Sequence, residues 1–208
     1  MGITCVLRRT SEAEFARLRE EPEAIGELLF GPEPATRQQT GLRGFLGWLW
    51  RASAEPEPEI ALPAPSLDAR AEQELDIDKA WHGLHFLFTG KEEGGEEPAC
   101  FLLEGGEEVS EPEDHEIGLD TPARALDASQ VRRFADFLDA LSPAELARRY
   151  DPLRMAELKI YPDVIWMRPP GKDEDGSPLE YLLDHFALLR DFIAGIAARG
   201  DGLIIYQS

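Results

Sequence analysis

Residues 74–90 read ELDIDKAWHGLHFLFTG and place two histidines three positions apart, beside a tryptophan. Asp76 belongs to the preferred N-cap types, so the stretch predicts a helix beginning at Ile77. At about 100° per residue, this helix carries an apolar stripe and an adjacent polar stripe. The polar stripe consists of Asp78, His82, His85 and Thr89. Gly83 lies away from both stripes, where the missing side chain allows another element to pack closely.

Three interpretations compete for the polar stripe. The two histidines could share a metal ion with Asp78, but their spacing differs from HExxH, in which the histidines are four apart, and no fourth ligand is evident. Asp78 could orient an imidazole for acid–base work or ligand binding in a cleft. Alternatively, the imidazoles bond to buried groups and pin the helix. The sequence favours this third, structural interpretation.

The surrounding sequence predicts alternating strands and helices. Strands are expected at residues 3–9, at CFLLE (100–104), irregularly at 159–166 because of Pro162, and at the C-terminus. Ser11 with Glu14 forms a capping box, and Asp127, Ser142-Pro143 and Asp151-Pro152 mark further helix starts. Helices are also expected at about 67–74 and at 178–199, which ends before Gly200. The pattern predicts one α/β domain over residues 1–208, with a mixed sheet flanked by helices.

Residues 31–66 form an excursion of different character within this domain. The segment is rich in proline and glutamate and contains an apolar island with Trp48 and Trp50. Few basic residues flank the island, so docking on the core is favoured over a partner-facing patch or a membrane contact. With no apolar run of about 20 residues and no signal-like start, the chain is expected to be cytoplasmic.

Charge limits the partners that the chain can take. The formal net charge is -20, and residues 91–120 hold twelve acids against one base, Lys91. Nucleic acids and anionic membranes would repel such a chain, because phosphates require basic side chains. A macromolecular partner is therefore expected to be a basic protein. Acidic runs of this kind are also common as solvated loops that keep a protein soluble.

Other chemistries lack support in the sequence. The chain has no phosphate-binding glycine loop, no GxSxG elbow and no CxxC pair. Its two cysteines, Cys5 and Cys100, are too few for a disulfide scaffold and are expected to be reduced thiols. No metal, no cofactor and no catalytic residue is expected.

Several stretches together resemble the YfbM-like family, bacterial proteins of a domain of unknown function. They are MGITCVL, LDIDKAWHGLHFLFTG, TPARALDASQV, RYDPLRM, IYPDVIW and EYLLDHFALLRDFIAGIAARGDGLIIY. The resemblance spans most of the chain except about residues 31–66 and the acidic loop. It implies a single mixed α and β domain and no established activity.

The resemblance carries over motif positions only, as candidates for ligand or partner binding. These are Asp78, Trp81, His82, His85, Arg124, Tyr161, Trp166 and His185. A Gly-Pro-Ala-Arg-Tyr-like run is expected before the middle helix, and this chain has Ala125 in place of the aromatic. His185, in the apolar stripe of the helix at 178–199, is expected to be a satisfied core residue.

Two main hypotheses for function remain open, beside a purely structural or oligomeric role for the Trp48 and Trp50 island. The first, which the charge favours, is a non-enzymatic acidic protein-binding module, such as an immunity or inhibitor protein that presents carboxylates to a basic toxin. The alternative is a small-ligand-binding protein or enzyme with a cleft around Asp78, His82, His85 and Arg124, with Trp81 or Trp166 as an apolar wall. A cleft that exposes both histidines would favour the alternative.

Overall fold

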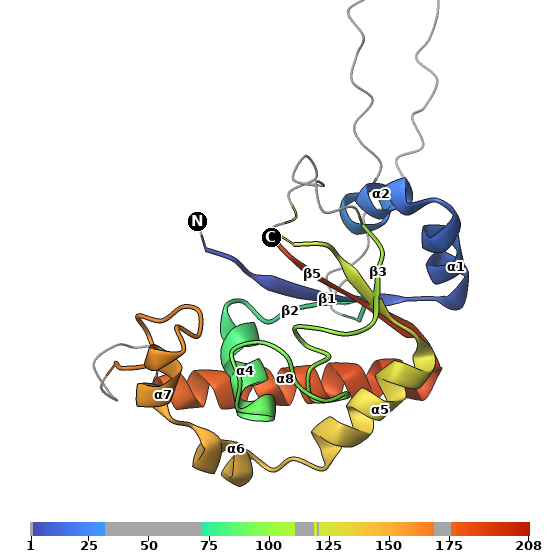
Figure 1. The fold of residues 1–208 in the computed structure, drawn as a ribbon. Helices are drawn as coiled ribbons and strands as arrows, with labels where there is room; N and C mark the ends of the chain where they lie inside the picture. The colour runs from blue at the N-terminus through green and yellow to red at the C-terminus, as the bar shows by residue number, and fades with distance from the viewer. Residues whose placement is uncertain (1, 32–71, 111–118, 120, 169–175) are drawn as a thin grey trace, which may run out of the picture.

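A computed structural model describes residues 2–31, 72–110, 119, 121–168 and 176–208. Its strands are β1 (Cys5–Thr10), β2 (Glu74–Asp76), β3 (Glu107–Glu108), β4 (Arg124–Leu126) and β5 (Gly202–Gln207). They form one five-stranded sheet in the order β2-β1-β5-β4-β3. The two ends of the chain meet in this sheet, because β1 pairs with β5 over its whole length. The termini accordingly lie side by side (Figure 1).

The predicted mixed α/β domain is confirmed, with one difference in the sheet. Each of the four pairings is antiparallel, so the described strands make an antiparallel sheet and not one of mixed direction. Among the described strands, no neighbouring pair is joined by a parallel β-α-β crossover. Instead, the long α8 leads through Gly200 and Asp201 directly into β5.

Helices cover both faces of the sheet (Figure 1). One face packs against α1 (Glu12–Glu20), the short 3-10 turn η1 (Pro22–Ala24) and α2 (Ile25–Phe30). The other packs against α4 (Ala80–Thr89), α5 (Ala128–Asp139) and α8 (Pro178–Arg199). The short helices α6 (Pro143–Arg149) and α7 (Pro152–Glu157) belong to the same core cluster, and α6 contacts α4 and α8. The caps predicted at Ser11, Asp127 and Ser142 are present as capping boxes, and Ser177, which was not predicted as a cap, forms another. These caps satisfy backbone donors that a helix start leaves open.

Two predicted strands are turns. Residues 98–103 form turns in which Phe101 and Leu102 are fully buried, and residues 161–167 also form bends and turns. The backbone groups of both segments bond within these turns and to side chains, and not to a neighbouring strand. In the first segment, the Arg124 guanidinium donates to the carbonyls of Phe101 and Leu102. In the second, the Trp166 indole N–H donates to the Ile160 carbonyl.

The opening helix begins later than the sequence predicts. Glu74 to Asp76 form β2 where the end of a helix was expected, and α4 starts at Ala80 instead of Ile77. The sheet edge extends past β2, because the Ile77 N–H donates to the Cys5 carbonyl. The Asp76 side chain then accepts from the Asp78 N–H at 2.7 Å, and Asp78 takes a left-handed φ of 47°. Asp76 therefore caps a turn and not a helix.

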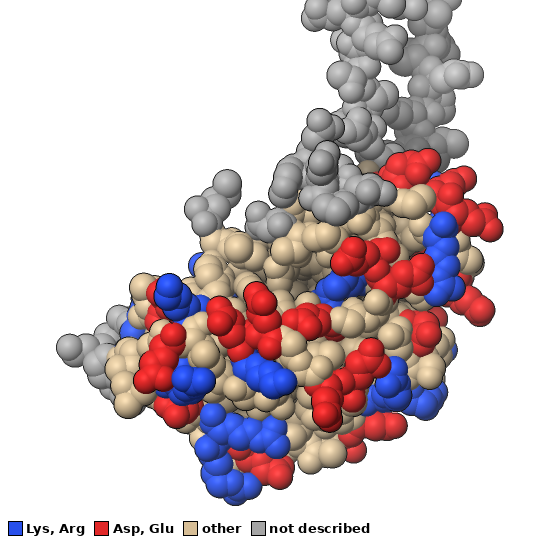
Figure 2. Space-filling model, in the orientation of Figure 1, with Lys and Arg blue, Asp and Glu red and all other residues tan. Residues whose placement is uncertain are grey.

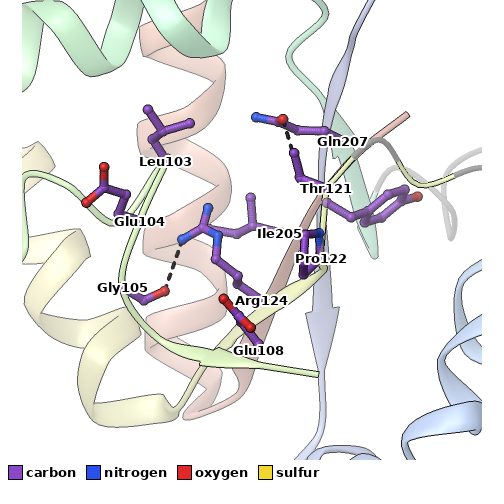
Figure 3. Close-up of a pocket in the computed structure, with 10 residues that line it drawn as sticks. Leu103, Glu104, Gly105, Glu108, Thr121, Pro122, Arg124, Ile205 and Gln207 are labelled. Carbon is purple, nitrogen blue, oxygen red and sulfur yellow. Dashed lines mark hydrogen bonds between the residues drawn. The ribbon is translucent and has the colours of Figure 1, made fainter. Parts of the chain in front are cut away.

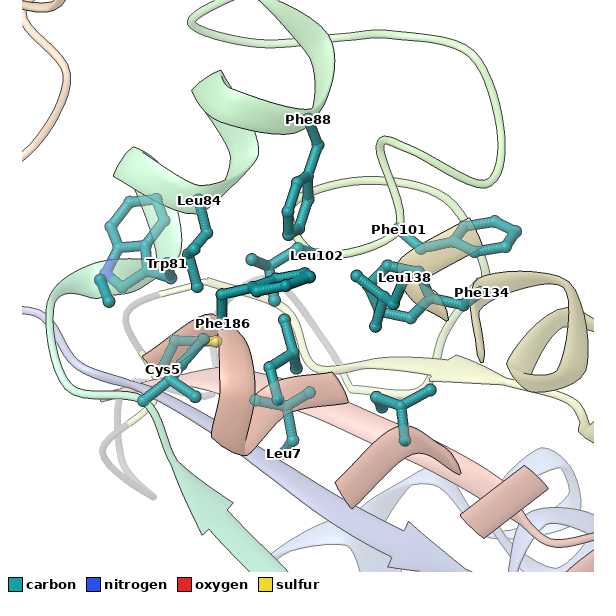
Figure 4. Packing of buried hydrophobic residues seen from close by; sticks show 14 of the residues in the cluster. Cys5, Leu7, Trp81, Leu84, Phe88, Phe101, Leu102, Phe134, Leu138 and Phe186 are labelled. Atoms are coloured by element: carbon teal, nitrogen blue, oxygen red, sulfur yellow. The ribbon is translucent and has the colours of Figure 1, made fainter. Parts of the chain in front are cut away.

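The core explains why both predicted stripes of α4 are enclosed. Every residue from Ala80 to Phe88 is buried, including Trp81, Leu84 and both histidines. Figure 4 shows side chains of α4, of the 98–104 turns and of α5 gathering around Phe186 of α8, above Cys5 and Leu7 of β1. A helix that is buried on all sides has no solvent-facing polar stripe.

Gly83 allows the close contact that its position predicts. A Cβ atom there would lie 2.7 Å from Cη2 of Trp166 and 2.8 Å from Cδ2 of Leu182, both buried. Gly83→Ala should lower the free energy of unfolding by about 1–3 kcal/mol through overpacking. Gly195→Ala is the matched control, because nothing lies within 4 Å of its added Cβ in α8. That variant should gain about 0.5–1 kcal/mol. Urea unfolding measures both, and equal effects would contradict the contact.

Some predictions concern residues outside the described ranges. These are the Trp48 and Trp50 island, nearly all of the excursion at 31–66, and residues 111–118 and 120 of the acidic loop. They remain predictions.

Candidate functional site

His82 holds three segments of the chain together. Its Nδ1 accepts from the Tyr161 backbone N–H at 3.0 Å, which fixes the proton on Nε2. Nε2–H then donates to the Glu92 carbonyl at 2.9 Å. Burial lowers the pKa of His82, which agrees with a neutral ring. Both ring nitrogens are thus used by backbone groups, as the structural interpretation of the polar stripe predicts.

His82→Leu should therefore destabilise the fold. The substitution leaves the Tyr161 N–H without its acceptor and removes the ring that stacks on Trp81 at 4.9 Å. We expect a loss of about 2 kcal/mol in the free energy of unfolding. His185→Leu is the control and should cost about 0.5 kcal/mol or less, since its partly exposed ring bonds only within its own helix. Equal losses in the two variants would count against the linking role of His82.

The imidazole of His85 is buried in the core. Its side chain is fully enclosed, and neither ring nitrogen has a hydrogen-bond partner among the described residues. Burial, reinforced by the neighbouring His82, lowers the pKa of His85 to about 4. The ring is neutral at pH 7 and is packed inside the core. It is not exposed in a cleft with Asp78.

Arg124 supports the buried turns at 98–105. Its guanidinium donates to the carbonyls of Gly105 at 3.0 Å, Leu102 at 3.0 Å and Phe101 at 3.4 Å. Figure 3 shows this side chain in a cavity of about 280 Å³, between Glu104 and Glu108. Two carboxylates beside the guanidinium make this cavity a poor site for an anion. The main role of Arg124 is therefore to donate hydrogen bonds to the backbone carbonyls of these turns.

Three aromatic candidates form the junction between α4 and the 160–166 turns. Trp81 stacks on Tyr161 at 5.7 Å, and its indole N–H donates to the Ile3 carbonyl at 3.3 Å. The Tyr161 hydroxyl accepts from the Ile3 N–H at 2.9 Å, which ties the N-terminal segment to the same place. Trp166 is buried, and its carbonyl accepts from the Tyr150 hydroxyl.

The last candidate, His185, lies one turn after Tyr181 in α8. Its Nδ1–H donates to the Tyr181 carbonyl at 2.8 Å, and the two rings lie 4.3 Å apart. The ring is thus satisfied within its own helix, as expected, but it is partly exposed and is not a core residue. The Tyr181 hydroxyl, in contrast, bonds to Asp78 and Lys79, just before the start of α4.

The larger of two cavities near the candidates lies where the start of α4, the 161–168 turns and the start of α8 meet. It has a volume of about 640 Å³. Its polar lining includes Asp78, Lys79, Tyr161, Arg168 and Tyr181; its other lining residues are Pro162, Val164, Ile165, Gly176, Ser177 and Pro178. Of the eight sequence candidates, Asp78 and Tyr161 line this cavity, and Arg124 lines the smaller one.

Tyr181 fixes the Asp78 carboxylate at the wall of this cavity. The Tyr181 hydroxyl donates to Oδ2 of Asp78 at 3.0 Å and accepts from the Lys79 backbone N–H at 3.2 Å. Burial and the bond to Asp78 raise the pKa of Tyr181, so the phenol remains a donor at neutral pH. The left-handed backbone at Asp78 is uncommon for a residue other than glycine and is often found at ligand sites.

Lys79, Arg168 and Tyr181 were not predicted as site residues. Tyr181 was placed only in the apolar stripe of the helix at 178–199, where the spacing gives no sign of its hydroxyl partner. Lys79 directly follows Asp78 in sequence, so its proximity to that aspartate was the one available signal.

Metal and thiol chemistry find no support in the described part of the chain. No group of three or more His, Cys, Asp or Glu side chains there could hold a metal ion. Cys5 and Cys100 are buried free thiols. Burial raises the pKa of Cys5 to about 12 and also raises that of Cys100. Neither thiol is poised to act as a thiolate nucleophile.

The acidic window is partly neutralised within the fold. Glu107 forms a two-pronged pair with Arg19, Glu97 pairs with Arg133, and Glu104 accepts from the Gly94 N–H. On the face seen in Figure 2, acidic and basic side chains are interspersed. Glu92, Glu93 and Glu96 are exposed and form no ion pair among the described residues. No helix in the described ranges is long and apolar enough to cross a membrane.

Comparisons with known proteins find one family model and a similar solved structure. The family model described as "Domain of unknown function (DUF1877)" matches residues 1–206. A crystal structure of YfbM from Escherichia coli, a protein of unknown function, superposes with a TM-score of 0.57 at 18% identity and covers 99% of each chain. That likeness concerns the fold alone. No curated protein matches the chain.

Proposed function

Because the chain belongs to the DUF1877 family, whose function is unknown, we propose a function from its own geometry: it is a small-ligand-binding protein. The site is the Asp78 cavity, defined by the lining of the 640 Å³ cavity described above. The carrying observation is the carboxylate of Asp78, held at the cavity wall by Tyr181 through a left-handed backbone. Its volume falls within the range of about 300–1,000 Å³ that is typical of ligand pockets.

The lining suits binding better than catalysis. Two tyrosine hydroxyls, one carboxylate and two cations converge on a wall that Val164 and Ile165 make partly apolar. Burial and the bond to Asp78 raise the pKa of Tyr181, which moves it away from neutrality. A catalytic acid or base would have its pKa tuned toward the working pH. His82 and His85 are buried outside this lining, so they are not part of the proposed site.

A library of small molecules tests the proposal by ligand-observed NMR. Val164 lines the cavity and is 71% exposed, so Val164→Trp should fill the space while stability changes by no more than about 0.5 kcal/mol. Leu188→Trp is the matched control, because Leu188 is also exposed (53%) but lies on α8, outside the cavity lining. Ligands found with the wild type should be lost in Val164→Trp and kept in Leu188→Trp. Ligands that bind both variants equally would refute the site.

A second candidate function is the binding of a basic protein, such as a toxin that an immunity or inhibitor protein would neutralise. It is favoured by the exposed Glu92, Glu93 and Glu96, which form no ion pair among the described residues. The His82 bond to the Glu92 carbonyl holds this turn in place. Carboxylates presented on a fixed turn can imitate the phosphates that a basic nuclease binds.

Charge-neutral variants separate this function from general acidity. Changing Glu92, Glu93 and Glu96 together to glutamine should abolish salt-sensitive binding to purified basic nucleases. The same change at Glu12, Glu20 and Glu23, which are exposed and form no ion pair among the described residues, removes equal charge elsewhere. If both triple variants weaken binding alike, attraction is unspecific. If the wild type binds no basic nuclease, this second candidate fails.

A further inference from the structure

We infer that the ligand of the Asp78 cavity carries both an ammonium group and a carboxylate, in the class of free amino acids and short peptides. The inference rests on the proposed function of this cavity. It follows from two adjacent side chains of opposite charge, Asp78 and Lys79, which line the same space.

Asp78 and Lys79 do not neutralise each other. No ion pair joins them within 4.0 Å, and the Lys79 side chain has no hydrogen bond or ion pair among the described residues. Asp78 is instead held by Tyr181, which bonds to Oδ2 and leaves Oδ1 without a hydrogen bond in that part of the chain. Both charges are partly buried. Such charges are stabilised by a ligand that brings a partner to each.

The position of Lys79 is constrained on its far side. A Cβ atom added to Gly2 would lie 2.6 Å from Cε and 3.2 Å from Nζ of Lys79, so the N-terminal segment packs along this side chain. The same imaginary Cβ would lie 2.6 Å from the Tyr161 hydroxyl. The ammonium of Lys79 is therefore held at one side of the cavity, beside Tyr161, while Tyr181 holds the carboxylate of Asp78.

Apart from Arg168, the second cation of the cavity, the remaining lining suits the neutral part of such a ligand. Pro162, Val164 and Ile165 supply apolar surface, and the rings of Tyr161 and Tyr181 stand at the two charged groups. A molecule with an ammonium and a carboxylate joined by an alkyl or peptide unit complements this arrangement of one acidic side chain, one basic side chain and apolar surface. A singly charged analogue would leave either Asp78 or Lys79 without a partner. The cost of that unpaired, partly buried charge would give specificity for the doubly charged ligand.

Matched probes test the inference. The zwitterions are 4-aminobutyrate, whose singly charged analogues are butylamine and butyrate, and alanyl-alanine, whose analogues are alanyl-alanine amide and N-acetyl-alanyl-alanine. Titrations by NMR or calorimetry should find a zwitterion that binds at least about tenfold more tightly than both of its analogues. Asp78→Asn and Lys79→Gln should each weaken it about tenfold. Asp139→Asn and Lys91→Gln, which make the same charge changes outside the cavity, should not.

The outcomes separate the ligand class from the proposed function. If singly charged analogues bind as tightly as the zwitterions, or if no zwitterion binds, the inference is wrong. If library ligands are then still displaced by Val164→Trp, the cavity remains a binding site for another class of molecule. If those ligands are not displaced either, the proposed function also fails. Because asparagine keeps an acceptor for Tyr181, Asp78→Asn should preserve the fold, and urea unfolding verifies this.

Discussion

Arg124→Met should lower the free energy of unfolding by about 3 kcal/mol or more. The guanidinium donates to three carbonyls, those of Phe101, Leu102 and Gly105, in a segment that has no ladder partner of its own. Methionine keeps the apolar stem but donates nothing, so these carbonyls lose charged donors. A hydrogen bond to a charged group contributes about 1.5–3 kcal/mol. Urea unfolding, followed by circular dichroism, measures the loss.

Arg148→Met is the control for this variant. Arg148 is exposed on α6 and makes no hydrogen bond or ion pair among the described residues, so its loss should stay within about 0.5 kcal/mol. A stable Arg124→Met protein would mean that the guanidinium is free for an anionic ligand. That result would support the sequence-based hypothesis in which Arg124 holds an anionic group.

The second large effect is a loss of stability in mild acid that His85 causes. Its pKa is about 4 in the folded protein, against 6.5 for the unconstrained side chain. Between these values the unfolded chain binds a proton that the folded chain does not, so stability is present above about pH 6.5 and falls toward pH 4. Between about pH 7.5 and pH 5, His85 should remove about 2 kcal/mol.

His85→Leu isolates this contribution from the many carboxylates of the chain. Leucine has no proton to bind and leaves no unpaired ring nitrogen, so the variant should be at least as stable as the wild type at pH 7.5. Its advantage should then grow by about 2 kcal/mol on acidification to pH 5. An advantage that does not depend on pH would show that the imidazole is not kept neutral by burial.

The sequence was most informative where local signals and tertiary packing agree. The helix at 178–199 was predicted with its observed bounds, since Pro178, the apolar stripe and Gly200 all indicate the same element. The capping box at Ser11 and the helix cap at Asp127 marked true helix starts. Gly83 was recognised as a point of close approach, which Trp166 and Leu182 occupy.

It was least informative where a distant side chain decides the backbone. CFLLE resembles a strand because its residues are apolar, yet its carbonyls bond to Arg124, about 20 positions later. Residues 77–79 could continue a helix toward the N-terminus, but Ile77 pairs with Cys5 at the sheet edge. Such long-range contacts override local preference.

The candidate site was predicted in part. The structural interpretation of His82 agrees with its two backbone bonds, and Asp78 and Tyr161 line the proposed cavity. The cleft that would join Asp78, His82, His85 and Arg124 is absent from the described structure, since both histidines are buried. Helical periodicity placed Asp78 beside His82, whereas the left-handed turn at Asp78 directs the chain away from a helical path.

The most direct test of the central claim is amide chemical-shift mapping of the wild-type protein with a ligand from the library. The claim is that the Asp78 cavity binds ligands while His82, His85 and Arg124 hold the fold. Shifts should centre on the segments 78–79, 161–165 and 176–181, which contain all of the cavity's lining residues except Arg168. Shifts centred on residues 94–105 and 124, with no change around Asp78 and Tyr181, would contradict it.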